Sequence, residues 1–110
     1  MSLFTKIQTA IENNNADKWL ELYHEDFEFV RHKSGTSMNR EEIHQMIKRM
    51  FASGAVVQED HRCLYENEDI LVEHSFMDFP DGSREAVLVV HQIKNGKIIR
   101  TETGATPISK

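Results

Sequence analysis

The segment at residues 69–79 restricts the folds open to this chain more than any other stretch. Its sequence, DILVEHSFMDF, is rich in β-branched and aromatic residues, which favour a β-strand. Turn-forming residues border the segment on both sides, ENED at 66–69 and PDG at 80–82. The neighbouring segments 55–66 and 83–94 also favour strands, so we expect the central segment to pair along both of its edges.

A further hairpin is predicted at Asn95 and Gly96. An Asn-Gly pair between two strand-like segments is the strongest short signal for a two-residue hairpin loop, and here it adds residues 97–106 as another strand. The last two-thirds of the chain is therefore predicted to be an antiparallel meander of four strands.

The first half of the chain contains three segments in which apolar residues have helical spacing. Ser2 is placed to cap the first helix, and Asn15 is placed to cap a second, shorter one. Asn39 is placed to cap the third helix, where Glu42 completes a capping box.

The order of elements is α-α-β-α-β-β-β-β, with a strand at 27–32 before the third helix and Gly54 at the end of that helix. This order predicts an α+β fold in which three helices from the N-terminal half pack against one face of a curved sheet. With 110 residues, the chain is expected to form a single domain, residues 1–110.

The charge and the cysteine content argue against several classes of function. The net charge is −5 and no cluster is basic, which argues against nucleic acid or an anionic membrane as a partner. Cys63 is the single cysteine, so we expect neither an internal disulfide nor a cysteine-based zinc motif. The N-terminus lacks the apolar run of a signal peptide, and no segment is long and apolar enough to span a bilayer. We therefore expect a soluble cytoplasmic protein.

Short turns also predict which residues of the sheet are neighbours. Tight loops in the meander place His61 opposite His74, and His74 opposite Leu88. The Asn-Gly turn places Val90 opposite Thr101. We orient the face with both histidines toward the helices, because the opposite face carries more fixed charge. That outer face also has many apolar residues, so we expect a second copy of the chain to cover it in a homodimer.

Several stretches of the sequence resemble one fold family. They are WLELYHEDFEF at 19–29, the turn at Gly35, the helix after Asn39, and NGKIIR at 95–100. With this order of elements, nearly the whole chain resembles the nuclear-transport-factor-2-like (NTF2-like) superfamily, which includes SnoaL-like polyketide cyclases and ketosteroid isomerases. The resemblance implies a cone-shaped, curved antiparallel sheet around an internal pocket. It does not specify an activity, because the fold hosts enzymes, ligand-binding domains and dimerisation modules.

The catalytic site of the isomerases can be compared position by position. Their base is an aspartate at the end of the first strand, and the matching position here is about Arg31, whose guanidinium stays protonated. The position of their oxyanion-hole aspartate falls near Leu88, which is apolar. The resemblance therefore does not imply steroid isomerase chemistry.

The candidate site consists of side chains that we expect to point into the cone. His61 and His74 are predicted to be catalytic, because two neighbouring imidazoles resist double protonation and one can then act as a base. Glu59 is predicted to orient one of them, and Arg31 to bind a carboxylate or enolate oxygen of the ligand. The other predicted substrate-binding residues form walls of the pocket: Trp19, Tyr23, Tyr65 and Thr101.

These residues predict a small-molecule-binding protein. The first hypothesis is a cofactor-free enzyme of the isomerase, cyclase or hydrolase type that transfers protons on a small carbonyl compound. The alternative is a non-catalytic ligand-binding or dimerisation module, in which the polar residues form a structural cluster or the histidines lie at the dimer surface. Two histidines with Glu59 also match the ligand number of a catalytic zinc or non-haem iron site, but their spacing fits no known metal motif. We therefore predict neither a metal nor a cofactor.

Overall fold

The computed structural model describes residues 2–32, 34–54 and 57–108. In chain order its elements are α1 (Leu3–Glu12), α2 (Ala16–Leu20), β1 (Tyr23–Arg31), β2 (Thr36–Asn39), α3 (Arg40–Ser53), β3 (Val57–Glu66), β4 (Ile70–Asp78), β5 (Arg84–Lys94) and β6 (Lys97–Ile108). Ala55, the first residue of the strand expected at 55–66, lies outside the described residues.

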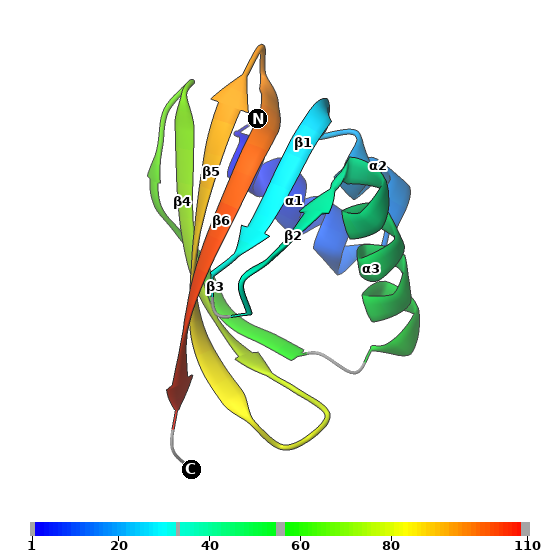
Figure 1. The fold of residues 1–110 in the computed structure, drawn as a ribbon, viewed down its shortest axis with the longest axis vertical. Helices are drawn as coiled ribbons and strands as arrows, with labels where there is room; N and C mark the ends of the chain where they lie inside the picture. The colour runs from blue at the N-terminus through cyan, green and yellow to red at the C-terminus, as the bar shows by residue number, and fades with distance from the viewer. Residues whose placement is uncertain (1, 33, 55–56, 109–110) are drawn as a thin grey trace.

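Six strands form one curved sheet in the order β2-β1-β6-β5-β4-β3. Strands β3 to β6 make the antiparallel meander that the turns predicted, while β1 runs parallel to β6 and β2 pairs with β1. Figure 1 shows the long strands β5 and β6 running the length of the molecule, with the helices gathered on one side of the sheet. The predicted α+β fold, three helices on a curved sheet, is therefore confirmed.

The core lies between the helices and the sheet face that they cover, which we call the inner face. Burial of apolar surface in this layer is the main force that holds the helices on the sheet. The buried cluster takes residues from all three helices and from three strands: Ile7, Ala10, Trp19, Tyr23, Phe27, Ile43, Leu71 and Ile98.

The helices begin at the capping residues that the sequence predicted. The side chains of Ser2 and Asn15 accept hydrogen bonds from backbone N–H groups of the first turns of α1 and α2, at 3.1 and 3.0 Å. Asn39 and Glu42 form the capping box of α3, with distances of 2.9 and 3.0 Å. Gly54 ends α3 in the left-handed conformation, with φ of 61°. None of the helices in the described part of the chain is long and apolar enough to cross a membrane.

The first two strands differ from the prediction. The sequence predicted that the first strand begins at residue 27, whereas β1 begins at Tyr23. The Ile98 N–H donates to the Leu22 carbonyl at 2.9 Å, so pairing with β6 draws the chain into the sheet earlier. Strand β2 is not predicted, because four residues are too few to show an alternating pattern.

The predicted register holds between β4 and β5 but fails between β3 and β4. His74 pairs with Leu88 as predicted. The turn after β3 is longer than the tight loop predicted, because Glu66 pairs with Leu71, and two irregularities then change the pairing along the strand. As a result, Arg62 rather than His61 lies opposite His74. Asp60, within the first irregularity, has a positive φ of 53°, as residues in β-bulges often do.

The register between β5 and β6 is also shifted from the prediction. His91 rather than Val90 lies opposite Thr101, and the pairing changes between Gln92 and Ile93. Because neighbouring residues of a strand face opposite sides of the sheet, a shift of one residue changes which side chains meet. Thr101 therefore meets His91 on the inner face.

The prediction that the His74 face meets the helices is wrong. The inner face of β4 carries Glu73 and Ser75, which are 5% and 2% exposed. Val72, His74 and Phe76 lie on the opposite side, the outer face, and are only partly buried. The prediction relied on fixed charge, and it failed because the buried carboxylate of Glu73 finds hydrogen-bond donors inside the protein.

Candidate functional site

Glu73 is at the centre of a buried polar cluster on the inner face. Its Oε1 lies 2.5 Å from His61 Nε2, and its Oε2 is hydrogen-bonded to His91 Nε2. His91 Nδ1 lies 2.7 Å from the Thr101 hydroxyl oxygen. We call His61, Glu73 and His91 the His–Glu–His cluster.

Four adjacent strands bring these side chains together. Glu73 of β4 and His91 of β5 are diagonal neighbours on one face, and Thr101 of β6 lies opposite His91. The irregularity at Asp60 in β3 accompanies the turn of His61 toward this face. The bulge therefore decides whether His61 reaches Glu73.

The Glu73 carboxylate is ionised in spite of its burial. Its side chain is 7% exposed, and burial by itself raises a carboxyl pKa because it disfavours the charged form. Hydrogen bonds from His61 and His91, together with their charges, more than offset burial and lower the pKa of Glu73 from 4.5 to about 2. At neutral pH, Glu73 is therefore an acceptor through both oxygens.

The ionised carboxylate determines which nitrogen of each imidazole donates to it. Glu73 has no proton to donate, so each histidine donates to it through Nε2–H. The other ring nitrogen of His91, Nδ1, is hydrogen-bonded to the Thr101 hydroxyl. His61 Nδ1 has no hydrogen-bond partner among the described residues, and none of their buried polar side-chain atoms lacks one. His61 Nδ1 is therefore not fully buried.

Tyr23 forms an aromatic wall next to the cluster. Its ring packs on Trp19 and Phe27, with centroids 4.1 and 4.7 Å apart, and lies edge-on to His91 at 6.5 Å. Burial, followed by the charge of Glu73, raises the pKa of Tyr23 well above its ordinary value. The phenol therefore stays protonated and can act only as a neutral hydroxyl.

Four of the predicted site residues lie in or beside the cluster. His61 belongs to it, and Thr101 is hydrogen-bonded to His91. Trp19 and Tyr23 are buried in the adjoining aromatic wall, at 6% and 4% exposure.

Three other predicted residues lie elsewhere. His74 is on the outer face, and Tyr65 is 58% exposed. Glu59 forms an ion pair with Arg84 at 3.2 Å and has no contact with His61 through its carboxylate. The expected pair of neighbouring imidazoles, His61 and His74, is not formed, because the β3 bulge separates them onto opposite faces.

Arg31 lies at the exposed end of β1, which is four strand positions from β3 in the sheet. Neighbouring strands are about 4.8 Å apart, so the path along the sheet from β1 to β3 is roughly 19 Å. The strand order therefore separates the predicted carboxylate anchor from His61.

The sequence reasoning misses Glu73 and His91. A signal for them was present, because the predicted register between β4 and β5 already placed both on one face as diagonal neighbours. A carboxylate beside an imidazole on a face rich in apolar residues indicates a compensated buried pair. Assigning this face to the outside concealed it.

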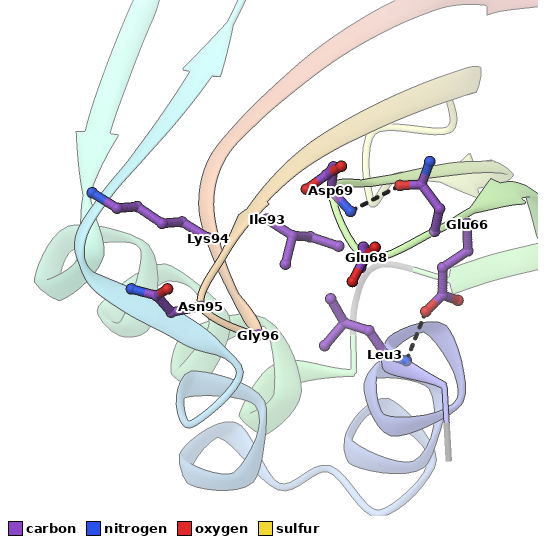
Figure 2. A pocket seen from close by; sticks show the side chains of 9 residues that line it. Leu3, Glu66, Glu68, Asp69, Ile93, Lys94, Asn95 and Gly96 are labelled. Atoms are coloured by element: carbon purple, nitrogen blue, oxygen red, sulfur yellow. Dashed lines mark hydrogen bonds between the residues drawn. The ribbon is translucent and has the colours of Figure 1, made fainter.

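A surface depression of about 610 Å³ lies at one end of the sheet, away from the cluster. Figure 2 shows it between the start of α1 and the turns that follow β3 and β5. Its lining residues are Leu3, Glu66, Asn67, Glu68, Asp69, Ile93, Lys94, Asn95 and Gly96. Within the described ranges, no group of three or more histidine, cysteine or acidic side chains is arranged to hold a metal ion.

Comparison with known proteins relates this architecture to other chains. Residues 4–101 match the family of the SnoaL-like domain. Among curated proteins, no match was found. An NTF2-like protein of unknown function from Mesorhizobium loti is 10% identical, with a TM-score of 0.80 over 93% of this chain and 86% of that one.

Two other solved structures have the same fold. A SnoaL-like protein of unknown function from Burkholderia thailandensis is 12% identical, with a TM-score of 0.72 over 94% of this chain and 90% of that one. A protein with a ketosteroid isomerase-like fold from Catenulispora acidiphila, solved in complex with trimethylamine, is 15% identical. Its TM-score is 0.63 over 91% of this chain and 82% of that one.

At these identities the structural neighbours support the fold alone. The family match, in contrast, extends over residues 4–101 of 110 and includes all three helices and the strands that carry the His–Glu–His cluster. The resemblance seen in the sequence is confirmed: the chain belongs to the SnoaL-like domain family of the NTF2-like superfamily.

Proposed function

We propose that this protein binds a small molecule at the inner face of its sheet and catalyses proton transfer on it without a cofactor, with His61 as the base. The proposed substrate is a small carbonyl compound, and the reaction is of the isomerase, cyclase or hydrolase type. One observation carries the proposal: Glu73 binds Nε2 of His61, while Nδ1 has no hydrogen-bond partner among the described residues and is not fully buried.

The contact with Glu73 would stabilise the positive charge that His61 gains when it acts as a base. When His61 Nδ1 takes a proton from a carbon next to a carbonyl, the C–H electrons move toward the carbonyl oxygen and the imidazole becomes positive. The ionised Glu73 compensates that charge through the Nε2–H bond. Return of the proton to a different ligand atom completes an isomerisation. His91 holds the second carboxylate oxygen and so prevents Glu73 from turning away.

The other predicted residues have lesser parts in this proposal. Tyr23 and Trp19 are proposed as walls of the binding region. Arg31 is left out, because β1 lies four strand positions from β3 in the sheet and a small ligand at His61 does not reach it. His74 and Glu59 are left out, because His74 is on the outer face and Glu59 is paired with Arg84. The bound trimethylamine of the Catenulispora protein supports a small-molecule ligand in this fold.

Hydrogen–deuterium exchange on a simple carbonyl compound tests the proposal. Wild-type protein in D₂O with pentane-2,4-dione or a β-keto acid should exchange the acidic C–H faster than buffer does, as followed by proton NMR. His61→Gln should lower the enzymatic rate by about 100-fold or more. His74→Gln, a matched control from the outer face, should leave it unchanged. Equal loss in both variants, or no exchange above buffer with any compound of the panel, contradicts the proposal.

A second candidate function follows from the closed hydrogen-bond network. Both oxygens of Glu73 are already occupied by His61 and His91, and a polar cluster that satisfies itself can be purely structural. The protein would then be a non-catalytic ligand-binding or dimerisation module. In that case His61→Gln lowers the melting temperature, and no exchange activity exists for the variant to lose.

We also infer that a second copy of the chain covers the outer face. Val57 and Tyr65 on β3 are 51% and 58% exposed, and Leu88 on β5 is 42% exposed. Val72 and Phe76 lie between them on β4 and are partly exposed. Exposed apolar side chains gathered on neighbouring strands of one sheet face are typical of a protein–protein interface, and symmetric dimers are the commonest solution.

Sedimentation equilibrium at micromolar concentration tests the homodimer. The wild-type protein should sediment as a dimer and Leu88→Glu as a monomer, because the new carboxylate would be buried without a partner. Ala52→Glu, at an exposed position of α3, should remain dimeric. A wild-type protein that sediments as a monomer rules the dimer out.

A further inference from the structure

The first turn of α1 is fastened to the end of β3 by the Glu66 side chain. The Leu3 N–H donates to Glu66 Oε2 at 3.0 Å, and the Phe4 N–H donates to Oε1 at 3.4 Å. Figure 2 shows the first of these bonds at the edge of the surface depression. These amides are among the first four of the helix, which have no partner within it, and a carboxylate at this end also complements the helix dipole. Glu66 therefore caps α1 although it lies at least 62 residues further along the chain.

This carboxylate holds the first turn of α1, which is less buried than the rest of the helix. Ile7 and Ala10, further along the helix, are each 3% exposed and belong to the buried core. Leu3 and Phe4 are only partly buried. Terminal turns with less buried surface open locally at lower cost, so the hydrogen bonds to Glu66 help to keep this turn ordered, together with the Ser2 cap and the packing of Leu3 and Phe4 on the core.

The ordered first turn places an aromatic ring on the proposed base. The Phe4 ring lies against the His61 imidazole, with centroids 4.7 Å apart and planes inclined at 50°. His61 is thus held at two places, by Glu73 at Nε2 and by Phe4 at the ring. Without the phenyl ring, the imidazole could rotate away from Glu73.

We propose that Glu66 is a positioning residue for His61. Acting through the first turn of α1, it keeps the Phe4 ring against the imidazole, and this contact keeps His61 Nε2 on Glu73. The inference deepens the proposed function, because it rests on His61 as the base. It assigns to Glu66 no contact with the ligand.

The tautomer of His61 gives a direct test that needs no substrate. Two-bond proton–nitrogen NMR spectra report which ring nitrogen carries the proton, and the wild-type protein should show the Nε2–H form. In Glu66→Ala, loss of the charge-assisted bonds should raise the minor Nδ1–H form of His61 by about tenfold. Glu66→Gln keeps one acceptor oxygen and should lie between the two. Glu68→Gln, an exposed carboxylate of the same turn, is the matched control and should resemble wild type.

The Phe4→Ala variant shows whether the effect passes through the aromatic ring. It should reproduce the tautomer change of Glu66→Ala, and the double variant should add nothing further, because both changes break one chain of contacts. If Glu66→Ala lowers the melting temperature and leaves the His61 tautomer unchanged, Glu66 is only a helix cap and the proposal is wrong. Should Glu66→Ala not fold, Glu66→Gln and Phe4→Ala still decide the question.

Failure of this inference differs from failure of the proposed function. If His61 is not a base, the wild-type protein exchanges no carbonyl C–H, yet the tautomer of His61 still responds to Glu66. If Glu66 does not position His61, exchange can persist while the tautomer shows no response.

Discussion

The two faces of β4 differ in a way that the polarity of their residues does not suggest. On the inner face, Leu71, Glu73 and Ser75 are 0%, 5% and 2% exposed, so a carboxylate and a hydroxyl are buried among helices. On the outer face, Val72 and Phe76 are only partly buried. The charged residue is inside, and the apolar residues are partly exposed.

Partners on neighbouring strands explain this difference. Glu73 receives hydrogen bonds from two imidazoles, and the Ser75 hydroxyl accepts a hydrogen bond from the Gln58 amide at 3.2 Å. Outside, the Phe76 ring meets the Arg84 guanidinium, 5.1 Å from its centroid. A buried polar group is tolerated when the protein replaces its bonds to water, so burial here follows available partners and not residue type.

Removal of the inner carboxylate should have the largest effect. Glu73→Ala leaves the buried His91 and the partly buried His61 without their acceptor. We expect a loss of about 3–5 kcal/mol in the free energy of unfolding. Urea denaturation measures it, with the exposed Glu68→Ala as the control. A loss below about 1 kcal/mol would mean that the cluster contributes little to the inner face.

The same carboxylate should make stability depend on acid pH. The pKa of Glu73 is lowered from 4.5 to about 2 in the folded protein. A lowered pKa stabilises the folded state above the unfolded value, and this contribution is lost as the pH falls through the folded value. The free energy of unfolding should therefore fall by about 3 kcal/mol between pH 4.5 and pH 2. Glu73→Gln should lack this loss, so the two curves should converge near pH 2; parallel curves would contradict the assignment.

Local signals predicted the helices and the centre of the sheet. The caps at Ser2, Asn15 and Asn39 depend on residues within one turn, and the short loop after β4 fixes the pairing of His74 with Leu88. These features need no information from distant parts of the chain, so a single sequence is sufficient for them.

The candidate site was predictable only in part, because it depends on non-local features. His61 was predicted to face His74 and instead contacts Glu73, since neither the longer turn after β3 nor the bulge at Asp60 can be seen in the alternation of β3. Glu73 and His91 were placed correctly relative to each other, and then assigned to the wrong face. Which face the helices cover depends on how donors and acceptors meet across four strands.

The bulge at Asp60 allows a further test of how His61 is held on the inner face. Asp60 has a φ of 53°, a conformation that β-branched residues adopt at a cost of about 1–2 kcal/mol. Asp60→Val should lower the free energy of unfolding by that amount and should loosen the His61–Glu73 contact, which the tautomer of His61 reports. Asp60→Gly tolerates the positive φ and is the control; equal effects of both changes would show that backbone conformation is not the cause.

The smallest effect is expected on the outer face. The His74 ring contacts Phe76, with centroids 5.3 Å apart, and its Nδ1 lies 3.5 Å from an Arg62 nitrogen. In a monomer, His74→Gln should therefore change the free energy of unfolding by less than about 0.5 kcal/mol. If a second copy covers this face, the same change should cost more at high protein concentration, where the dimer forms, than at low concentration. Urea denaturation at two protein concentrations therefore distinguishes an outer face that stays exposed from one that is buried in a dimer interface.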